Sequence, residues 1–289
     1  MPATEWFESA GPAAAERYRA AIARYSGLGS FDERAAPAPS GRVSVLVPSL
    51  DEALYVEDAV RSLARQTLRR DHPDQVEIVL VDSGSGDATR DLARPHVDRT
   101  ISAPRGKLTA LVDGVRKSHG DIVVEADADG WYPPGWLSRM VEPFWDESVV
   151  AVRGAHVYYD SAPLRPTWRL RRALFRSVGN FPGGVRAYRK SAFLATGGFR
   201  LGLDERSFWQ VWPEEEWRFR KRLESVGRLV DAREAVCFKS ARRNDPIFVH
   251  DARVDKFRAA AAKGDRFRDG VTDRLYRAQR RIRAAFALR

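Results

Sequence analysis

Two carboxylates one residue apart, Asp127 and Asp129, end an apolar run in the middle of the chain. The run, 122–126, is rich in β-branched residues and predicts a buried strand. Because side chains two apart on an extended backbone point the same way, both carboxylates are expected to face one ligand. Gly130 and then Pro133-Pro134 turn the chain away. Carboxylate oxygens are good ligands for hard divalent cations, so the pair predicts a cation or polar-ligand site at a strand end.

Short strands and short helices alternate in the first half of the chain. This alternation predicts an α/β fold with a mostly parallel, doubly wound sheet and helices on both faces. The carboxyl ends of such strands meet at one rim, where ligands bind. Three turns with unusual residues are expected there: 48–52, 82–87 and 127–134. The expected strands are 43–47, ended by Pro48, then 76–81, 97–101 and 122–126, and the expected helices lie near 56–64, 87–93 and 108–115.

Composition excludes several other classes of protein. The chain has 289 residues, of which 44% are hydrophobic and 30% charged, as in ordinary globular proteins. No run of about 20 apolar residues is present, so no membrane-spanning helix is expected. A secretory leader is not expected either, and Cys237, the single cysteine, excludes an intrachain disulfide. These features predict a cytoplasmic protein.

The net charge of +10 is unevenly spread. Residues 251–289 carry 12 Lys or Arg against 5 Asp, which leaves this tail at +7. One interpretation is solvated faces of basic helices. The other is attraction to a polyanion, such as phospholipid head groups at a membrane surface, nucleic acid or a phosphorylated acceptor.

Five segments, taken in order, resemble those of family-2 glycosyltransferases with the GT-A fold, over roughly residues 42–232. They are Pro48-Ser-Leu-Asp-Glu52, Val81-Asp-Ser-Gly-Ser-Gly-Asp-Ala-Thr89, Gly106-Lys-Leu-Thr-Ala-Leu-Val-Asp-Gly114, Asp127-Ala-Asp129, and Gly197-Gly-Phe199 followed by Glu214-Glu-Glu-Trp217. The chain departs from the family at Ser83, where a second Asp is usual, and at Leu50-Asp51, where Tyr-Asn is usual. The preferred nucleobase is therefore left open.

The resemblance implies metal-dependent, inverting transfer of a sugar from a UDP- or GDP-sugar to an acceptor hydroxyl or phosphate. Asp129 would bind Mn²⁺ or Mg²⁺, Asp127 would bind the metal or the donor's ribose, and His250 would complete the metal site. Glu216, or Glu215 after a shift of one residue, would be the general base. The residues implied in nucleotide-sugar binding are Pro48, Ser49, Glu52, Asp82, Lys107, Asp127, Arg242 and Arg243.

Other interpretations of the same residues stay open. Asp82 also suits turn chemistry, Lys107 also suits a solvated helix start, and a run of Glu also suits a helix N-terminus. The alternative functions are nucleotidyl transfer and a catalytically inactive glycosyltransferase-like binding module. The acceptor is not identified: a lipid phosphate, a glycan, a protein and modified DNA all remain candidates.

The domain organisation that follows has four parts. Residues 1–41 form an N-terminal helical extension that ends in an Ala- and Pro-rich linker. Residues 42–157 form the half that binds the nucleotide-sugar, and 158–250 form the half that contains the acceptor site and the base. Residues 251–289 form the basic helical tail, with peripheral contact to an anionic surface.

Overall fold

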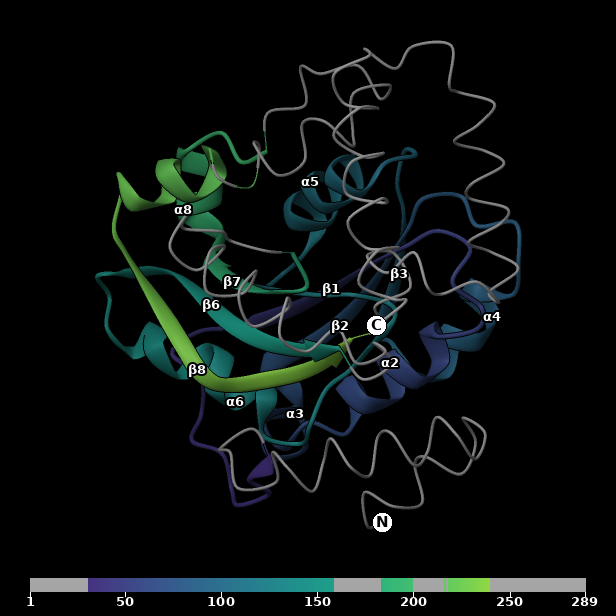
Figure 1. The fold of residues 1–289 in the computed structure, drawn as a ribbon, viewed down its shortest axis with the longest axis horizontal. Helices are drawn as coiled ribbons and strands as arrows, with labels where there is room; N and C mark the ends of the chain where they lie inside the picture. Colours follow the sequence, from purple (N-terminus) through teal and green to yellow (C-terminus); the bar gives the residue numbers. More distant parts are fainter. Residues whose placement is uncertain (1–30, 159–182, 200–215, 217, 240–289) are drawn as a thin grey trace, which may run out of the picture.

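The computed structural model describes residues 31–158, 183–199, 216 and 218–239, and Figure 1 shows their arrangement. Their strands form one eight-stranded sheet, in the order β3-β2-β1-β4-β7-β6-β8-β5. The strands are β1 (Val43–Ser49), β2 (Val76–Asp82), β3 (Arg99–Ser102), β4 (Ile122–Ala126), β5 (Gly130–Trp131), β6 (Val149–Tyr158), β7 (Val185–Arg189) and β8 (Arg228–Lys239).

The half of the sheet that comes first in the sequence is parallel, as predicted. Strands β3, β2, β1 and β4 pair in parallel, whereas β7 is antiparallel to both β4 and β6. Strand β8 pairs in parallel with β6 and antiparallel with β5. The α/β class is therefore confirmed, and the complete sheet is mixed. Both predicted halves, 42–157 and 158–250, contribute strands to it.

Helices cover both faces of the sheet (Figure 1). Apolar residues of α2, α3 and α6 pack on one face, and those of α5 and α8 pack on the other, together with Phe219 and Leu223. Alternation along β1 divides the two cores, since Val45 and Val47 face the first and Leu46 faces the second. The labelled helices of the described residues are α2 (Val56–Ala64), α3 (Thr67–Asp71), α4 (Thr89–Ala93), α5 (Lys107–Lys117), α6 (Trp136–Val141) and α8 (Lys190–Ala195), with short 3-10 turns η3 (Pro73–Gln75), η4 (Arg94–His96) and η5 (Glu142–Trp145). A further helix includes 216 and 218–224.

Pro48 does not end β1, contrary to the prediction. The strand runs on to Ser49, and Pro48 lies opposite Val81 of β2. The pairing of β1 with β4 stops earlier, at Leu46 and Glu125. Pro48 therefore lies beyond the last paired residue on that side, where a missing backbone N–H costs no ladder hydrogen bond.

The described part of the N-terminal extension, residues 31–41, is not a regular α-helix but an irregular segment held to the main body. The Ala36 N–H donates to Asp71, and the Ala36 carbonyl contacts the His72 ring. Further along, the Ser40 hydroxyl donates to the Phe144 carbonyl. The helical predictions for residues 1–30 and 251–289 lie outside the described residues.

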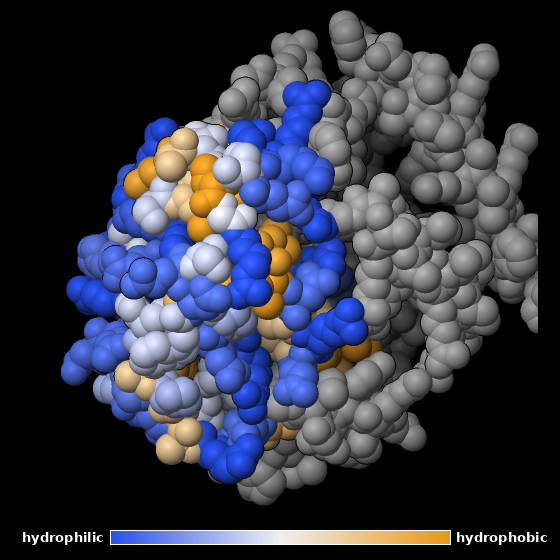
Figure 2. Space-filling view, turned by 90° about the vertical axis from the view of Figure 1, so that its left-hand side faces the viewer, coloured by the Kyte–Doolittle hydropathy of each residue, from blue (hydrophilic) through white to orange (hydrophobic). Residues whose placement is uncertain are grey.

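The part of the chain that the structure describes holds no helix with the length and apolarity needed to cross a bilayer. Figure 2 shows the side that is on the left in Figure 1, and its described surface is mostly hydrophilic. Hydrophobic residues there occur in small groups between hydrophilic ones. Leu194 and Val226 are among the exposed large apolar residues of the described structure.

Candidate active site

The ends of β1 and β2 lie side by side at one rim of the sheet. Ser49 and Asp82 are register partners, and both are buried. The Asp82 carboxylate accepts hydrogen bonds from the Gly84 N–H at 3.2 Å and the Ser85 hydroxyl at 2.5 Å. Arg90 Nε lies 3.7 Å from Asp82 Oδ2. Asp82 therefore organises its own turn, as the turn interpretation predicts, while remaining at the rim.

Two further predicted residues of this rim are buried. Glu52 is only 2% exposed, and its carbonyl accepts the backbone N–H groups of Tyr55 and Val56 at the start of α2. The Ser49 hydroxyl is buried and has no hydrogen-bond partner among the described residues. Buried polar groups are nearly always paired, so this hydroxyl is an exception among the described residues.

Asp127 and Asp129 do not lie on one extended strand. Strand β4 ends at Ala126, and residues 127–130 form a turn in which the Gly130 N–H donates to the Asp127 carbonyl. The same carbonyl accepts the Tyr132 hydroxyl. The expectation that both side chains point the same way rested on extended backbone, so the turn removes its basis. Each carboxylate has its own environment.

Two lysines hold the Asp127 carboxylate. Lys107 Nζ, at the start of α5, donates to Oδ1 at 2.7 Å, and Lys239 Nζ, at the end of β8, donates to Oδ2 at 2.6 Å. Burial alone would raise the pKa of Asp127, but the two ammonium groups outweigh it and hold this pKa well below its ordinary value. Asp127 is therefore an ionised anchor for two cations.

The turn before β7 joins this ion cluster to the predicted base. The Gly183 carbonyl accepts Lys239 Nζ at 2.8 Å, and the Gly183 N–H donates to Glu216 Oε1, also at 2.8 Å. Gly184 has φ +72°, and a Cβ there would lie 2.3 Å from Asp127 Cγ. Only glycine allows the turn to approach the carboxylate this closely.

Glu216 is buried in a helix whose described residues are 216 and 218–224. Burial raises the pKa of its carboxyl group above the ordinary value, against the opposing effects of Arg186 and the Gly183 N–H. A buried carboxylate with a raised pKa is suited to accept a proton near neutral pH.

A second buried ion pair lies directly behind Glu216. Glu125 of β4 and Arg186 of β7 are cross-strand partners, and Arg186 Nη2 lies 2.9 Å from Glu125 Oε2. The other Glu125 oxygen accepts the Tyr188 hydroxyl at 2.9 Å. Arg186 Nη1 reaches Glu216 Oε1 at 3.3 Å. Two carboxylates thus share one buried guanidinium group.

Sequence reasoning missed Lys239, Glu125 and Arg186. Each had a signal, because a single charged residue interrupts or ends an otherwise apolar run in Ile122–Ala126, Val185–Tyr188 and Ala235–Lys239. A charged residue that cannot leave a buried strand needs a partner of opposite charge. The structure brings together Lys107, Asp127 and Glu216, and places Pro48, Ser49, Glu52 and Asp82 at the β1–β2 rim. Glu215, Arg242, Arg243 and His250 lie outside the described residues.

The described residues contain no group of three or more His, Cys, Asp or Glu side chains that could hold a metal ion. Asp127 is unsuited to be a ligand in this arrangement, because each of its oxygens accepts an ammonium group. Asp129 is a partly exposed carboxylate in the turn that follows β4. Its carboxylate oxygens are of the kind that a hard divalent cation prefers, and Asp127 is partly exposed as well.

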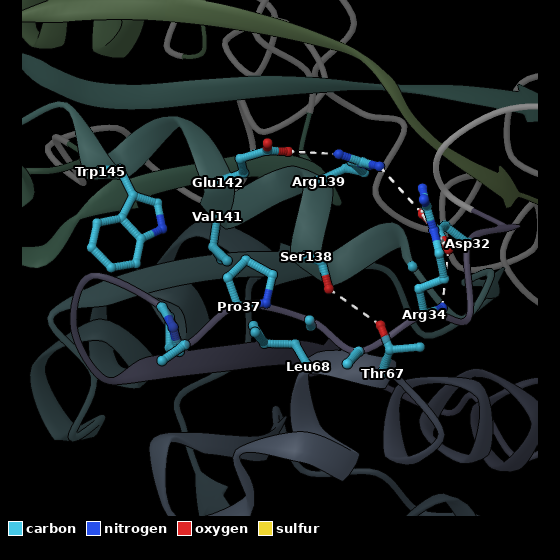
Figure 3. A pocket seen from close by; sticks show the side chains of 15 residues that line it. Asp32, Arg34, Pro37, Thr67, Leu68, Ser138, Arg139, Val141, Glu142 and Trp145 are labelled. Atoms are coloured by element: carbon cyan, nitrogen blue, oxygen red, sulfur yellow. Dashed lines mark hydrogen bonds and ion pairs between the residues drawn. The ribbon is translucent and has the colours of Figure 1, made fainter.

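A separate cavity of about 80 Å³ lies between residues 32–39, α3 and α6 (Figure 3). Polar contacts line it: the Thr67 and Ser138 hydroxyl groups are hydrogen-bonded, and Arg139 forms ion pairs with Asp32 and Glu142. None of the predicted site residues lines it. It is smaller than the ~300–1,000 Å³ of typical small-molecule sites. The carboxylate and lysine cluster, not this cavity, is the candidate active site.

Comparison with known proteins finds a matching family model and several relatives. The family model described as glycosyl transferase family 2 matches residues 44–209. The undecaprenyl-phosphate 4-deoxy-4-formamido-L-arabinose transferase of Pseudomonas fluorescens is 33% identical over 177 residues, covering 54% of this chain and 49% of that protein. An uncharacterized glycosyltransferase of a Nostoc species is 33% identical over 118 residues, covering 38% and 35%. The chain thus spans about half or less of the length of these relatives.

Solved structures show the same fold. A Pyrobaculum calidifontis mannosyltransferase in complex with GDP-Man and Mn²⁺ matches with a TM-score of 0.54 and 23% identity, covering 82% of this chain and 68% of that one. Staphylococcus aureus TarS (residues 1–349) matches with a TM-score of 0.53 and 17% identity, covering 69% and 60%. The sheet, its rim and the family match lead to one conclusion: the chain belongs to glycosyl transferase family 2 and has the GT-A fold.

Proposed function

We propose that this chain is an inverting glycosyltransferase that uses a UDP- or GDP-sugar and Glu216 as its general base. One observation carries the proposal. Gly183 binds Glu216 through its backbone N–H and Lys239 through its backbone carbonyl. A candidate base and a cation that suits a diphosphate therefore lie on either side of one glycine, and a single displacement needs both groups close to the anomeric carbon.

The proposed reaction is a single step. The acceptor oxygen attacks the anomeric carbon from the face opposite the diphosphate, and its proton passes to Glu216 Oε. The bond between the anomeric carbon and the diphosphate oxygen breaks, and its electron pair leaves with the nucleoside diphosphate. The Lys107 and Lys239 ammonium groups stabilise the negative charge that gathers on this leaving group.

Asp129 is the proposed ligand of a divalent cation, Mn²⁺ or Mg²⁺, with His250 as a second ligand from outside the described residues. Such a cation, when bound, would neutralise diphosphate charge. Asp127 has a different proposed role, because it orients the two lysines. Arg242 and Arg243 are proposed as further diphosphate contacts.

The nucleoside is proposed to lie across the ends of β1 and β2. The Ser49 hydroxyl, which has no hydrogen-bond partner in the described part of the chain, supports this placement, as do the buried residues Glu52 and Asp82 at the same rim. Carboxylates accept hydrogen bonds from ribose hydroxyl groups and from ring N–H groups, so both suit a nucleoside. Pro48 contributes backbone to this pocket.

The proposed acceptor is a lipid phosphate at a membrane surface. Two observations support it: several relatives are named undecaprenyl-phosphate transferases, and the segment 251–289 has a net charge of +7. A basic segment is attracted to anionic lipids. The proposed location is accordingly the cytoplasm, with peripheral membrane contact. In this case Glu216 takes the proton of a singly ionised phosphate rather than that of an alcohol.

The test is release of nucleoside diphosphate from a panel of UDP- and GDP-sugars, with undecaprenyl phosphate as acceptor and with Mn²⁺, Mg²⁺ or EDTA. We expect turnover of one donor, loss of turnover in EDTA and in Asp129→Asn, and a fall of about 100-fold or more in Glu216→Gln. Glu224→Gln, on the surface of the same helix, is the matched control and should retain activity.

Three results would count against parts of the proposal. Turnover that persists in EDTA would contradict the proposed metal dependence, and full activity of Glu216→Gln would contradict the assignment of Glu216 as the base. Nucleotide binding with no turnover of any donor would favour an inactive binding module.

A further inference from the structure

The pair formed by Glu125 and Arg186 has no role in the reaction as proposed, yet it is the most deeply buried ionic group of the described structure. Arg186 is 0% exposed, and the Glu125 side chain is 1% exposed. Isolated buried charges are costly, and even a buried pair is not a favoured way to stabilise a core. Its position behind Glu216 therefore calls for an explanation beyond packing.

The guanidinium group of Arg186 is fixed from several sides. It lies over the Phe199 ring, 4.8 Å from the centroid, and 5.7 Å from the centroid of Phe219. Glu125 holds one of its amino groups, and Tyr188 holds Glu125 in turn. The other amino group faces Glu216. The geometry is that of a rigid support with one contact directed at the site.

We infer that Arg186 is a positioning residue that holds Glu216 in the active site, and that Glu125 takes enough of the guanidinium charge to keep Glu216 a competent base. The inference rests on the proposed function of Glu216. An arginine paired with Glu216 alone would stabilise its ionised form and weaken it as a base. Because Arg186 is shared with Glu125, it can hold the Glu216 side chain in place while Glu216 keeps its basicity.

The groups around Glu216 are consistent with this division. Arg186 and the Gly183 N–H favour its ionised form, and Lys107 does so from a greater distance. Burial and the negative charge of Glu125 oppose them. The carboxylate of Glu125 is therefore the one negative group among these described neighbours that keeps the proton affinity of Glu216 high.

Two variants should shift the pKa of Glu216 in opposite directions. Glu125→Gln keeps the shape of the side chain but removes its charge, so Arg186 pairs with Glu216 alone and the acidic limb of kcat/KM moves down by about one pH unit. The double variant Glu125→Gln/Arg186→Met removes both buried charges, which protects the fold. In the double variant Glu216 loses its paired cation, so the acidic limb of the kcat/KM profile moves to higher pH.

The titration of Glu216 itself gives a second readout that needs no turnover. The protein is labelled with ¹³C at the glutamate side-chain carboxyl, and the Glu216 signal is identified by its absence in Glu216→Gln. We expect the pH at the titration midpoint of the Glu216 signal to fall in Glu125→Gln, to rise in the double variant and to stay unchanged in Glu224→Gln. Recovery of the parental midpoint in Glu125→Asp would confirm that charge, not shape, is responsible.

The outcomes separate the inference from the proposed function. A Glu216 midpoint that does not move in folded Glu125→Gln, or that moves upward, overturns the inference. If the midpoints shift as expected but Glu216→Gln keeps full turnover, the positioning network is real and the base assignment is wrong.

Discussion

At the scale of single residues, the contacts of Asp127 differ from those that its sequence motif predicts. The sequence places it in an Asp-x-Asp pair, which predicts metal binding. The structure places an ammonium group on each of its oxygens. Both lysines are largely buried, with side chains 14% and 7% exposed. Removal of the carboxylate charge would take a close ion-pair partner from both lysines.

Asp127→Asn is accordingly expected to lower the free energy of unfolding by about 3 kcal/mol at pH 7. The folded-state pKa of Asp127 lies below its ordinary value of 3.8, so its contribution is present above 3.8 and is lost as the pH falls further. Urea unfolding at pH 7 and at pH 3 measures this. The gap between parent and variant should narrow at pH 3, and a gap that stays constant would show that Asp127 acts without its charge.

At the scale of elements, the turn 183–184 is the point where three segments meet. It precedes β7, contacts Glu216 through one peptide and lies against Asp127 through the next. Gly197 has a similar backbone angle, φ +76°, but nothing lies within 4 Å of the position of a Cβ there. Gly184 and Gly197 both adopt a positive φ, but only Gly184 has atoms close to the position of a Cβ.

This difference predicts unequal effects of the same substitution. Gly197→Ala should cost about 1 kcal/mol, the strain of a left-handed conformation alone. Gly184→Ala adds a clash with the Asp127 carboxylate, so it should lower the melting temperature further and also weaken nucleotide binding. Thermal unfolding and calorimetric titration with UDP and GDP measure both effects. Equal losses in the two variants would mean that the turn does not press on Asp127.

Local patterns predicted the elements well because they depend on neighbours in the sequence. The apolar spacing in α2 and α5 and the β-branched runs of β1, β2 and β4 each matched the structure. Strand β8 was missed, since its first half, Arg228–Glu234, is polar and partly exposed and gives no clear alternation. The lysine contacts of Asp127 were also missed, because 20 and 112 residues separate it from Lys107 and Lys239. No local pattern reports such a meeting.

At the scale of the whole molecule, one mixed sheet brings the two halves of the chain to a common site. The parallel half supplies Ser49, Glu52 and Asp82 from the ends of β1 and β2. The other half supplies Lys239 from β8 and Arg186 from β7, with Glu216 from the helix beside them. Neither half contains both the β1–β2 rim, where the nucleoside is proposed to bind, and the proposed base. We therefore predict that a residue at the end of β8 contributes to donor binding.

The most direct measurement is calorimetric titration of the full chain and of Lys239→Met with UDP and GDP, beside Lys117→Met. Lys117 is exposed on α5 and pairs with Asp113, so its variant controls for the loss of one positive charge. We predict that one nucleotide binds the parent and Lys117→Met equally and binds Lys239→Met at least 10-fold more weakly. Equal binding by all three proteins, or binding of neither nucleotide by the folded parent, would contradict the account.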